Sequence, residues 1–243
     1  MRTRKKKWTA RELAENPRIV YSPETYKGRW HSFFGNSNPI SLEIGCGKGK
    51  FIAQAANAFP DRNFIGLERD QTILAAAARL GLRVTEDARL AYIISDVEEM
   101  PTLFAPGEIQ TLYIQFCDPW PNKKKWAKRR LTHSRFLRIY RELGVAAIFF
   151  KTDNRQLFEF SLEQFSQEGW LMKSISLDLH SSASSADETQ FTTEYEEKFI
   201  ALGQPIYRLE AYDRGGGGLK DANGSTGEIE EPAASNDLFS EDE

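Results

Sequence analysis

An acid, a proline and an aromatic ring follow an apolar segment directly, and a dense cationic run comes next. The apolar segment Thr111–Cys117 is typical of a strand, and Asp118-Pro119-Trp120-Pro121 ends it. Six of the eight residues 123–130 are then Lys or Arg. In an open α/β sheet, ligands bind outside the carboxyl ends of the strands. A carboxylate there can hold the polar edge of a base, an aromatic ring can stack on it, and cations can hold phosphates.

A glycine turn, Gly45-Cys46-Gly47-Lys48-Gly49, follows the predicted strand Ile40–Ile44. Glycines at such a turn let a ligand approach the backbone closely. The spacing does not fit a phosphate-binding loop, and Lys50 occupies the last position of the dinucleotide fingerprint, where Gly or Ala is needed. Glu43, just before the glycines, favours a cationic ligand, such as the ammonium and sulfonium of S-adenosylmethionine. The alternative is a tight turn that binds nothing.

Two further acids end predicted strands. Glu68 ends the segment Asn63–Glu68, where an acid can accept hydrogen bonds from ribose hydroxyls, or can simply cap the helix that follows. Asp96 follows the segment Ala91–Ser95 and could meet an adenine amino group. The alternative for Asp96 is an acid that only starts a turn.

Three other polar stretches allow more than one interpretation. Asp153 follows the apolar segment Val145–Phe150, and its default role is a helix cap, although it could face the same crevice. The basic run 123–130 could be a solvated helix face, but its position next to Asp118 favours phosphate contacts. Thr192–Phe199 is predicted as a polar loop before a strand, and its chemistry alone does not indicate a function.

The elements that must position these residues alternate along the chain. Strands are predicted at 40–44, 63–68, 91–95, 111–117 and 145–150, with helical apolar spacing between most of them. Gly81 is expected to close the second helix, and Gly169 the helix that begins after Asp153-Asn154. Leu171–Leu179 and Glu197–Tyr212 are expected to form a closing antiparallel pair. The pattern predicts an α/β fold with a mostly parallel central sheet and helices on both faces.

Composition and charge divide the chain into three parts. We expect an N-terminal basic extension at 1–38, a domain at 39–212 and a disordered acidic tail at 213–243. The tail carries nine acids and two cations, so the rest of the chain is net positive although the whole has a charge of −3.

Several protein classes are not favoured. The two cysteines, Cys46 and Cys117, and three scattered histidines predict neither a disulfide framework nor a metal site. No apolar run has membrane-spanning length, and the basic N-terminus lacks the apolar core of a signal peptide. The expectation is a cytoplasmic protein without membrane or metal partners.

Taken together, these residues resemble the bacterial tRNA (guanine-N7-)-methyltransferase family from about Met1 to Tyr212. Four segments carry the resemblance: Leu42-Glu43-Ile44-Gly45, Asp118-Pro119-Trp120-Pro121 with Lys128-Arg129-Arg130-Leu131, Lys151-Thr152-Asp153-Asn154, and Thr193-Glu194-Tyr195-Glu196. The resemblance implies a Rossmann-like class I methyltransferase fold, S-adenosyl-L-methionine as the methyl donor, and guanine 46 of the tRNA variable loop as the target.

The resemblance also implies roles for individual residues. Asp118 is the expected catalytic acid. The expected cofactor-binding residues are Glu43, Gly45, Gly47, Glu68, Asp96 and Asp118. The expected substrate-binding residues are Lys123, Asp153, Thr193, Glu194, Tyr195 and Glu196. The expected RNA-binding residues are Lys124, Lys125, Lys128, Arg129 and Arg130.

One departure concerns the substrate lysine. The family usually has a lysine directly after the Asp-Pro-Trp-Pro segment, where this chain has Asn122, so Lys123 is expected to take that role. Two alternatives stay open: a class I methyltransferase acting on another RNA, and a non-catalytic RNA-binding protein with a Rossmann-like core. The sequence does not distinguish a monomer from a homodimer.

Overall fold

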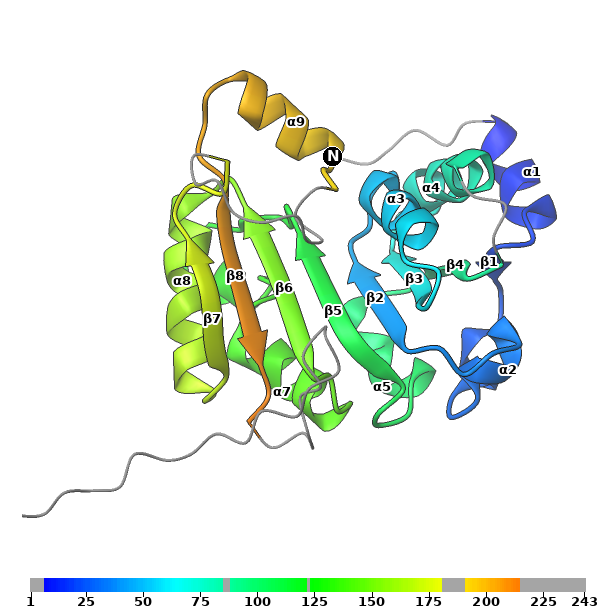
Figure 1. Cartoon of the computed structure of the whole chain (residues 1–243), viewed down its shortest axis with the longest axis horizontal. Helices are drawn as coiled ribbons and strands as arrows, with labels where there is room; N and C mark the ends of the chain where they lie inside the picture. Colours follow the sequence, from blue (N-terminus) through cyan, green and yellow to red (C-terminus); the bar gives the residue numbers. More distant parts are fainter. Residues whose placement is uncertain (1–6, 85–87, 122, 181–190, 215–243) are drawn as a thin grey trace, which may run out of the picture.

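The computed structural model describes residues 7–84, 88–121, 123–180 and 191–214. Its centre is an eight-stranded sheet in the order β1-β4-β3-β2-β5-β6-β8-β7 (Figure 1). The strands are β1 Ile19–Val20, β2 Ile40–Ile44, β3 Asn63–Glu68, β4 Leu90–Ile94, β5 Ile109–Gln115, β6 Ala147–Thr152, β7 Leu171–Ser176 and β8 Tyr207–Tyr212.

Strand direction confirms the expected α/β fold. Strands β1 to β6 pair in parallel, whereas β8 runs antiparallel to both β6 and β7. The chain winds from β2 outward through β3 and β4, then returns to place β5 on the other side of β2. The strand order therefore reverses between β2 and β5, and ligands of such sheets bind outside the carboxyl ends at that point.

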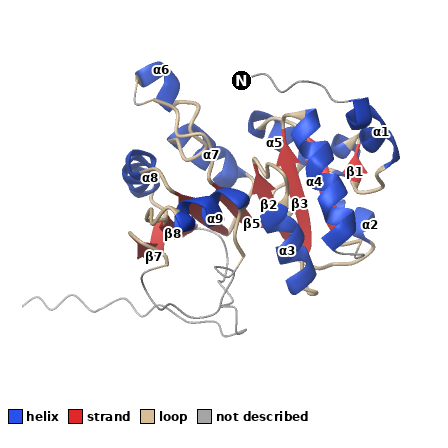
Figure 2. Ribbon diagram, turned by 90° about the horizontal axis from the view of Figure 1, so that it is seen from above, coloured by secondary structure: helices blue, strands red, loops and turns tan. Residues whose placement is uncertain are grey.

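Helices cover both faces of the sheet (Figure 2). Helices α3 (Lys50–Ala58) and α4 (Gln71–Val84) share one hydrophobic cluster with the sheet. The opposite face packs against α5 (Met100–Leu103), α7 (Ser134–Glu142) and α8 (Arg155–Gln167). The remaining helices are α1 Lys7–Glu15, η1 Pro23–Tyr26, α2 Trp30–Phe34, η2 Val97–Glu99, α6 Lys124–Ala127 and α9 Glu194–Ala201.

Alternation along β2 shows how the sheet separates the core from the site. Ile40, Leu42 and Ile44 are fully buried in the cluster beneath α7 and α8. Successive strand residues point to opposite faces, so Ser41 and Glu43 point toward the face of α3 and α4. Glu43 is therefore a buried acid at the carboxyl end of the strand next to the reversal point.

The segment before Pro39 joins the same sheet and core. Strand β1 pairs with β4, and the fully buried Trp30 donates a hydrogen bond from Nε1 to the Leu103 carbonyl oxygen at 2.9 Å. Trp30 also lies against the Phe104 ring, with centroids 5.5 Å apart. Residues 19–34, which were expected to belong to a basic extension, thus share a core with the predicted domain.

Most predicted strands agree with the structure, and 40–44 and 63–68 agree in both bounds. The expectation for Gly81 was wrong, because α4 continues to Val84. A Cβ atom on Gly81 would lie 2.8 Å from the Tyr92 hydroxyl, so this glycine allows close packing rather than ending the helix. Gly169, at φ 72°, follows α8 in the left-handed conformation, as expected.

The prediction for Thr192–Phe199 was also wrong, because Glu194–Ala201 is a helix and only Tyr207–Tyr212 is a strand. Thr193 caps this helix by accepting a hydrogen bond from the Glu196 backbone N–H at 3.0 Å. Three acids in its first turn suit the positive end of the helix dipole.

The acidic tail beyond Arg214 lies outside the described residues. Within the described part of the chain, no helix is long and apolar enough to cross a membrane.

Candidate active site

The glycine turn after β2 is held in place by β3. The backbone N–H groups of Gly45 and Cys46 donate to the Leu67 carbonyl oxygen at 2.8 and 3.1 Å. Gly45 and Gly47 have φ angles of 67° and 54°, which only glycine adopts at low cost. A Cβ atom on Gly45 would meet nothing within 4 Å, whereas one on Gly49 would lie 2.8 Å from Ala77 Cβ. Gly49 therefore serves helix packing, and the space over Gly45 is open to a ligand.

Two carboxylates lie beside this turn. Glu43 is buried, and its Oε2 has no hydrogen-bond partner in the described structure. Burial, reinforced by the charge of Glu68, raises the pKa of Glu43 well above its usual value. Glu68 accepts hydrogen bonds from the Gly47 and Asp70 backbone N–H groups at 3.3 and 3.0 Å. Burial raises the pKa of Glu68 despite these donors. A cationic ligand would relieve both effects, because it favours the ionised carboxylates.

The acids after β4 and β5 are exposed at the same edge. Asp96 accepts a hydrogen bond from the Glu98 backbone N–H at 3.2 Å and so begins η2, which is the turn role weighed from the sequence. The side chain of Asp118 is 70% exposed, and its Oδ2 lies 3.9 Å from Arg69 Nη2. Arg69 follows β3 directly, so this pair links two strand ends across the reversal point.

Helix α9 lies above the carboxyl ends of β5 and β6 (Figure 1). Lys48 and Lys50, from the glycine turn and the start of α3, form ion pairs with Glu194 and Glu197 of α9. Phe199 of the same helix stacks with Phe116, with ring centroids 6.2 Å apart. Helix α9 therefore bridges the loops after β2 and β5, the two strands at the reversal point.

A buried ion pair fixes α9 to β6. Glu196 is fully buried, and its two oxygens lie 3.2 and 3.3 Å from Lys151 Nζ. His180 Nε2 lies 3.0 Å from Glu196 Oε1. Sequence reasoning missed Lys151 and His180, because neither belongs to α9 or stands near it in the chain.

The predicted substrate residues of α9 thus have different surroundings. Thr193 caps the helix, Glu194 pairs with Lys48, and Glu196 pairs with Lys151. Tyr195 is 61% exposed at this edge. Their substrate roles remain predictions, and Tyr195 is the member best exposed for a direct contact.

Asp153 does not cap α8, although a helix cap was its default interpretation from the sequence. The cap of α8 is Asn154, which accepts a hydrogen bond from the Leu157 backbone N–H at 2.8 Å. Asp153 is half-buried at the carboxyl end of β6, and burial raises the pKa of its carboxyl. This position is compatible with the predicted substrate role.

The basic run divides into exposed cations and one buried cation. Lys123, Lys125, Lys128 and Arg129 are exposed, and none has an acidic partner among the described residues. Arg130 is only 1% exposed, and its Nε and Nη2 donate to the Trp120 carbonyl oxygen at 3.0 and 2.7 Å. This guanidinium holds the loop, and its predicted contact with RNA stays a prediction that its burial does not favour. Asn122 and the side chain of Lys124 lie outside the described part.

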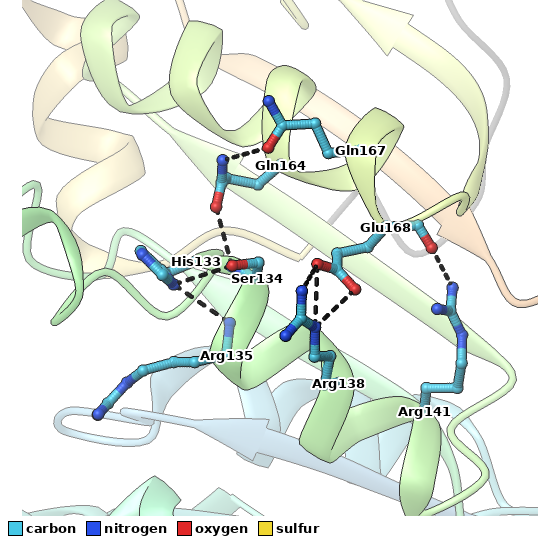
Figure 3. A network of polar contacts seen from close by, with 8 residues as sticks. All are labelled: His133, Ser134, Arg135, Arg138, Arg141, Gln164, Gln167 and Glu168. Carbon is cyan, nitrogen blue, oxygen red and sulfur yellow. Dashed lines mark hydrogen bonds and ion pairs between the residues drawn. The ribbon is translucent and has the colours of Figure 1, made fainter.

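Helix α7, which follows the basic run, is anchored on α8 (Figure 3). The Ser134 backbone N–H donates to Gln164 Oε1 at 2.9 Å. Arg138 donates to both carboxylate oxygens of Glu168 at 2.8–3.1 Å, and Arg141 donates to the Glu168 carbonyl oxygen at 2.7 Å. The Ser134 contact holds the start of α7, and the two arginines hold the rest of the helix, so the loop that carries the exposed cations is attached to a fixed helix.

The thiol next to Asp118 lies in surroundings that disfavour its ionised form. Cys117, next to Asp118, is a free thiol whose pKa is raised to about 12, mainly by burial and also by the Asp118 charge. The thiol is therefore protonated at neutral pH and a poor nucleophile. Across the residues described, no cluster of three or more His, Cys, Asp or Glu side chains could hold a metal ion.

Comparison with known proteins identifies the family. A family model described as "Putative methyltransferase" matches residues 37–209. The tRNA (guanine-N(7)-)-methyltransferase of Bacillus licheniformis is 48% identical over 214 residues, covering 87% of this chain and 98% of the relative. The proteins of that name from Bacillus subtilis and Listeria monocytogenes are each 47% identical, covering 86% and 88% of this chain and 98% and 100% of the relatives. The chain belongs to the tRNA (guanine-N(7)-)-methyltransferase family.

Solved structures support the fold of this family member. "Structure of an antibiotic related Methyltransferase" and "Crystal Structure of 16S rRNA Methyltranferase KamB" both superpose with a TM-score of 0.55. They are 15% and 13% identical, and each alignment covers 76% of this chain and 92% of the other. At this identity the likeness supports a shared class I methyltransferase fold and nothing more.

Proposed function

We propose that this chain transfers a methyl group from S-adenosyl-L-methionine to N7 of a guanine in tRNA, and that the guanine is position 46 of the variable loop. Family membership supports the reaction. The structural observation that supports it best is the unpaired Oε2 of Glu43, buried beside an open glycine turn at the reversal point. A basic loop whose exposed cations have no acidic partner among the described residues follows the adjacent strand, where an RNA substrate would be expected.

The residues around the glycine turn fit the donor. S-adenosylmethionine, when bound, supplies a methyl group activated by its sulfonium. Glu43 and Glu68 provide negative charge for the cationic groups of the donor, and the backbone at Gly45 and Gly47 leaves room for close approach. Glu68 has lone pairs left for ribose hydroxyls, and the second oxygen of Asp96 can accept from an adenine amino group.

The acceptor atom simplifies the chemistry that the protein must perform. Guanine N7 carries a lone pair and no proton, so no strong base is needed at the nucleophile. Positioning is then the main contribution of the chain. Asp118 accepts from the guanine N1–H and amino group, and its charge favours the cationic methylated base. Adenine presents a mismatched edge and would leave this carboxylate unpaired, so the same contact gives specificity.

The other expected substrate residues surround this acid. Lys123 and Tyr195 are exposed, and Asp153 is half-buried at the neighbouring strand end. We infer that these three contact the substrate directly. Thr193, Glu194 and Glu196 act by holding α9, since each already has a partner within the protein.

Radiolabelled methyl transfer to an unmodified tRNA transcript tests the function, followed by identification of the methylated base. N7-methylguanine at position 46 is the expected product, and a tRNA with adenine at that position is expected to remain unlabelled. Label on another base or in another RNA would favour the other-RNA methyltransferase. Absence of calorimetric binding of S-adenosylmethionine would favour a non-catalytic RNA-binding protein.

Asp118→Asn tests the catalytic assignment. The amide can no longer accept both guanine donors or stabilise positive charge, so we expect kcat to fall by about 100-fold or more. The Kd for tRNA should stay within about twofold, because most binding energy comes from phosphate contacts. Asp61→Asn is the matched control, since Asp61 is an exposed acid before β3, at the opposite edge of the sheet. Equal losses of tRNA binding and turnover in Asp118→Asn would contradict the assignment.

A further inference from the structure

Two tryptophans of the basic loop stack on each other. The rings of Trp120 and Trp126 have centroids 5.3 Å apart and planes only 6° from parallel. The Arg129 guanidinium lies 3.9 Å from the Trp120 centroid and 5.4 Å from that of Trp126. Lys125 Nζ lies 5.2 Å from the Trp126 centroid. We call Trp120 and Trp126 the tryptophan stack.

The distances place Arg129 on the same side of the Trp120 ring as Trp126. If the Arg129 guanidinium and the Trp126 ring lay on opposite sides of the Trp120 ring, each in van der Waals contact with it, the guanidinium would lie more than 5.4 Å from the Trp126 centroid. The opposite side of Trp120 is thus covered by neither group. Both tryptophans keep part of their surface exposed.

The tryptophan stack does not belong to the protein core. Neither ring is among the buried residues of the two hydrophobic clusters, nor among the half-buried residues packed against them. Indoles normally contribute large apolar areas to a core. These two indoles pack on each other and on cations, away from the two described hydrophobic clusters, so a binding role explains them better than core packing does.

The surroundings favour a nucleic acid as the ligand of the stack. Lys123, Lys125, Lys128 and Arg129 are exposed on the same loop and lack acidic partners in the described part of the chain. Elsewhere in the site, Lys48 and Lys50 are neutralised by acids of α9. Cations without acidic partners around partly exposed aromatic rings are typical of surfaces that bind single-stranded nucleic acids, where rings stack on bases and cations hold phosphates.

The stack is also fixed in position before any ligand binds. Arg130 is buried, donates twice to the Trp120 carbonyl oxygen, and lies 4.4 Å from the Phe160 centroid of α8. This contact ties the loop to the body of the protein although α6 projects from it (Figure 2). A platform held in its binding conformation loses less entropy when a ligand binds.

We propose that the tryptophan stack holds an unpaired base of the tRNA next to the guanine that is methylated. Trp120 is two residues after Asp118, so their Cα atoms are at most about 7 Å apart. Neighbouring nucleotides of one strand can therefore reach both. Holding the neighbouring base keeps the strand unstacked and leaves the guanine free to enter the site. The proposal rests on the proposed function, because it takes tRNA as the partner.

Trp126→Leu in the full chain tests the platform against unmodified tRNA. The leucine keeps an apolar side chain but removes the ring that packs against Trp120, so the Trp120 indole is no longer held in place for a base to stack on its open side. We expect the Kd for tRNA to rise about tenfold or more. The salt dependence of binding should not change, because no phosphate contact is lost. Trp126→Phe, which keeps a ring, should recover most of the affinity, and the Kd for S-adenosylmethionine should be unchanged in both variants.

Lys128→Gln is the matched control for charge. It should weaken tRNA binding and reduce the slope of log K against log salt by about one, unlike Trp126→Leu. A tRNA with an abasic nucleotide on one or the other side of guanine 46 completes a double-mutant cycle. The loss caused by Trp126→Leu should disappear with one of these two tRNAs, because the stacked base is already missing.

Three results would overturn the proposal. The first is a Kd of Trp126→Leu for tRNA within twofold of the wild-type value. The second is a loss of tRNA affinity in Trp126→Leu that persists in full with both abasic tRNAs. The third is a loss of affinity for S-adenosylmethionine as large as the loss for tRNA. Displacement of tRNA from the wild type but not from Trp126→Leu by a peptide of residues 215–243 would assign the stack to the acidic tail instead. The proposed function fails separately, if the wild type binds tRNA but methylates no guanine.

Discussion

Glu43 is the residue at this site whose contributions to ligand binding and to the stability of the empty protein are expected to be opposite. A buried carboxylate oxygen without a hydrogen-bond partner costs free energy, and the nearby charge of Glu68 adds to that cost. Nothing in the described fold offsets the charge. A cationic ligand would offset it, so the same side chain that weakens the empty protein strengthens the complex.

Glu43→Gln should therefore change stability and binding in opposite directions. Because the pKa of Glu43 is raised in the folded state, the folded protein holds a proton that the unfolded chain loses above about pH 4.3. The stability of the ligand-free wild type thus falls as pH rises from there through the raised pKa. At pH 8 we expect the variant to be more stable by about 1 kcal/mol, and to bind S-adenosylmethionine about tenfold more weakly.

Urea unfolding at pH 6 and pH 8 measures the first effect, and calorimetric titration measures the second. Glu24→Gln, at an exposed acid of η1, is the control and should alter neither. A variant less stable than the wild type at both pH values would show that Glu43 has a stabilising partner in the folded protein.

Helix α9 is the element that joins the two halves of the site. Its acids pair with the glycine turn, its buried Glu196 pairs with Lys151 of β6, and Phe199 stacks on Phe116 after β5. The exposed ion pairs are expected to contribute little to the free energy of unfolding. Removing one member of a buried ion pair is expected to lower that free energy much more, because a buried charge then loses its opposite charge.

Glu196→Ala tests this difference at the level of the element. The buried ammonium of Lys151 then loses its carboxylate, and we expect a loss of about 3–5 kcal/mol in local or global unfolding free energy. Urea denaturation measures the global loss, and hydrogen exchange of residues 194–201 measures local opening. The double variant Lys151→Met/Glu196→Leu should lose less unfolding free energy than Glu196→Ala, because no buried charge is left alone. Glu197→Gln, at an exposed pair, should lower the unfolding free energy by at most about 1 kcal/mol. A double variant as unstable as Glu196→Ala would mean that the pair is not the main anchor of α9.

At the scale of the whole molecule, the N-terminal segment is part of the folding unit. Strand β1 extends the sheet beyond β4, and Trp30 fills the core below α5. From the sequence these residues were expected to form an extension, because isolated tryptophans in a polar stretch show no periodicity. A chain shortened to begin at Pro39 would therefore lose a strand and expose part of the core.

Trp30→Ala tests whether the N-terminal segment folds as one unit with the rest of the domain. Removing this fully buried ring and its hydrogen bond to the Leu103 carbonyl should lower the free energy of unfolding by about 3–5 kcal/mol. Thermal or urea unfolding of the full chain gives the value. Tyr21→Ala is the control, since Tyr21 is 62% exposed, and it should change stability by about 0.5 kcal/mol or less. A small effect of Trp30→Ala would support the three-part division of the chain.

The sequence alone determined the α/β architecture and the general location of the site. Apolar alternation at Ile40, Leu42 and Ile44 is local information, and the carboxyl ends of parallel strands must meet at one edge. Glu43, Glu68, Asp96 and Asp118 could therefore be assigned to a shared edge from their positions in the chain.

Only the tertiary structure decided which side chains of a motif face solvent and which are buried. Arg130 is buried while Arg129 is exposed, Glu196 meets a lysine 45 residues away, and Gly81 makes room for Tyr92. Burial and pairing depend on residues brought together by the fold from distant parts of the chain. Local pattern carries periodicity and turn chemistry, but it contains no information on those partners.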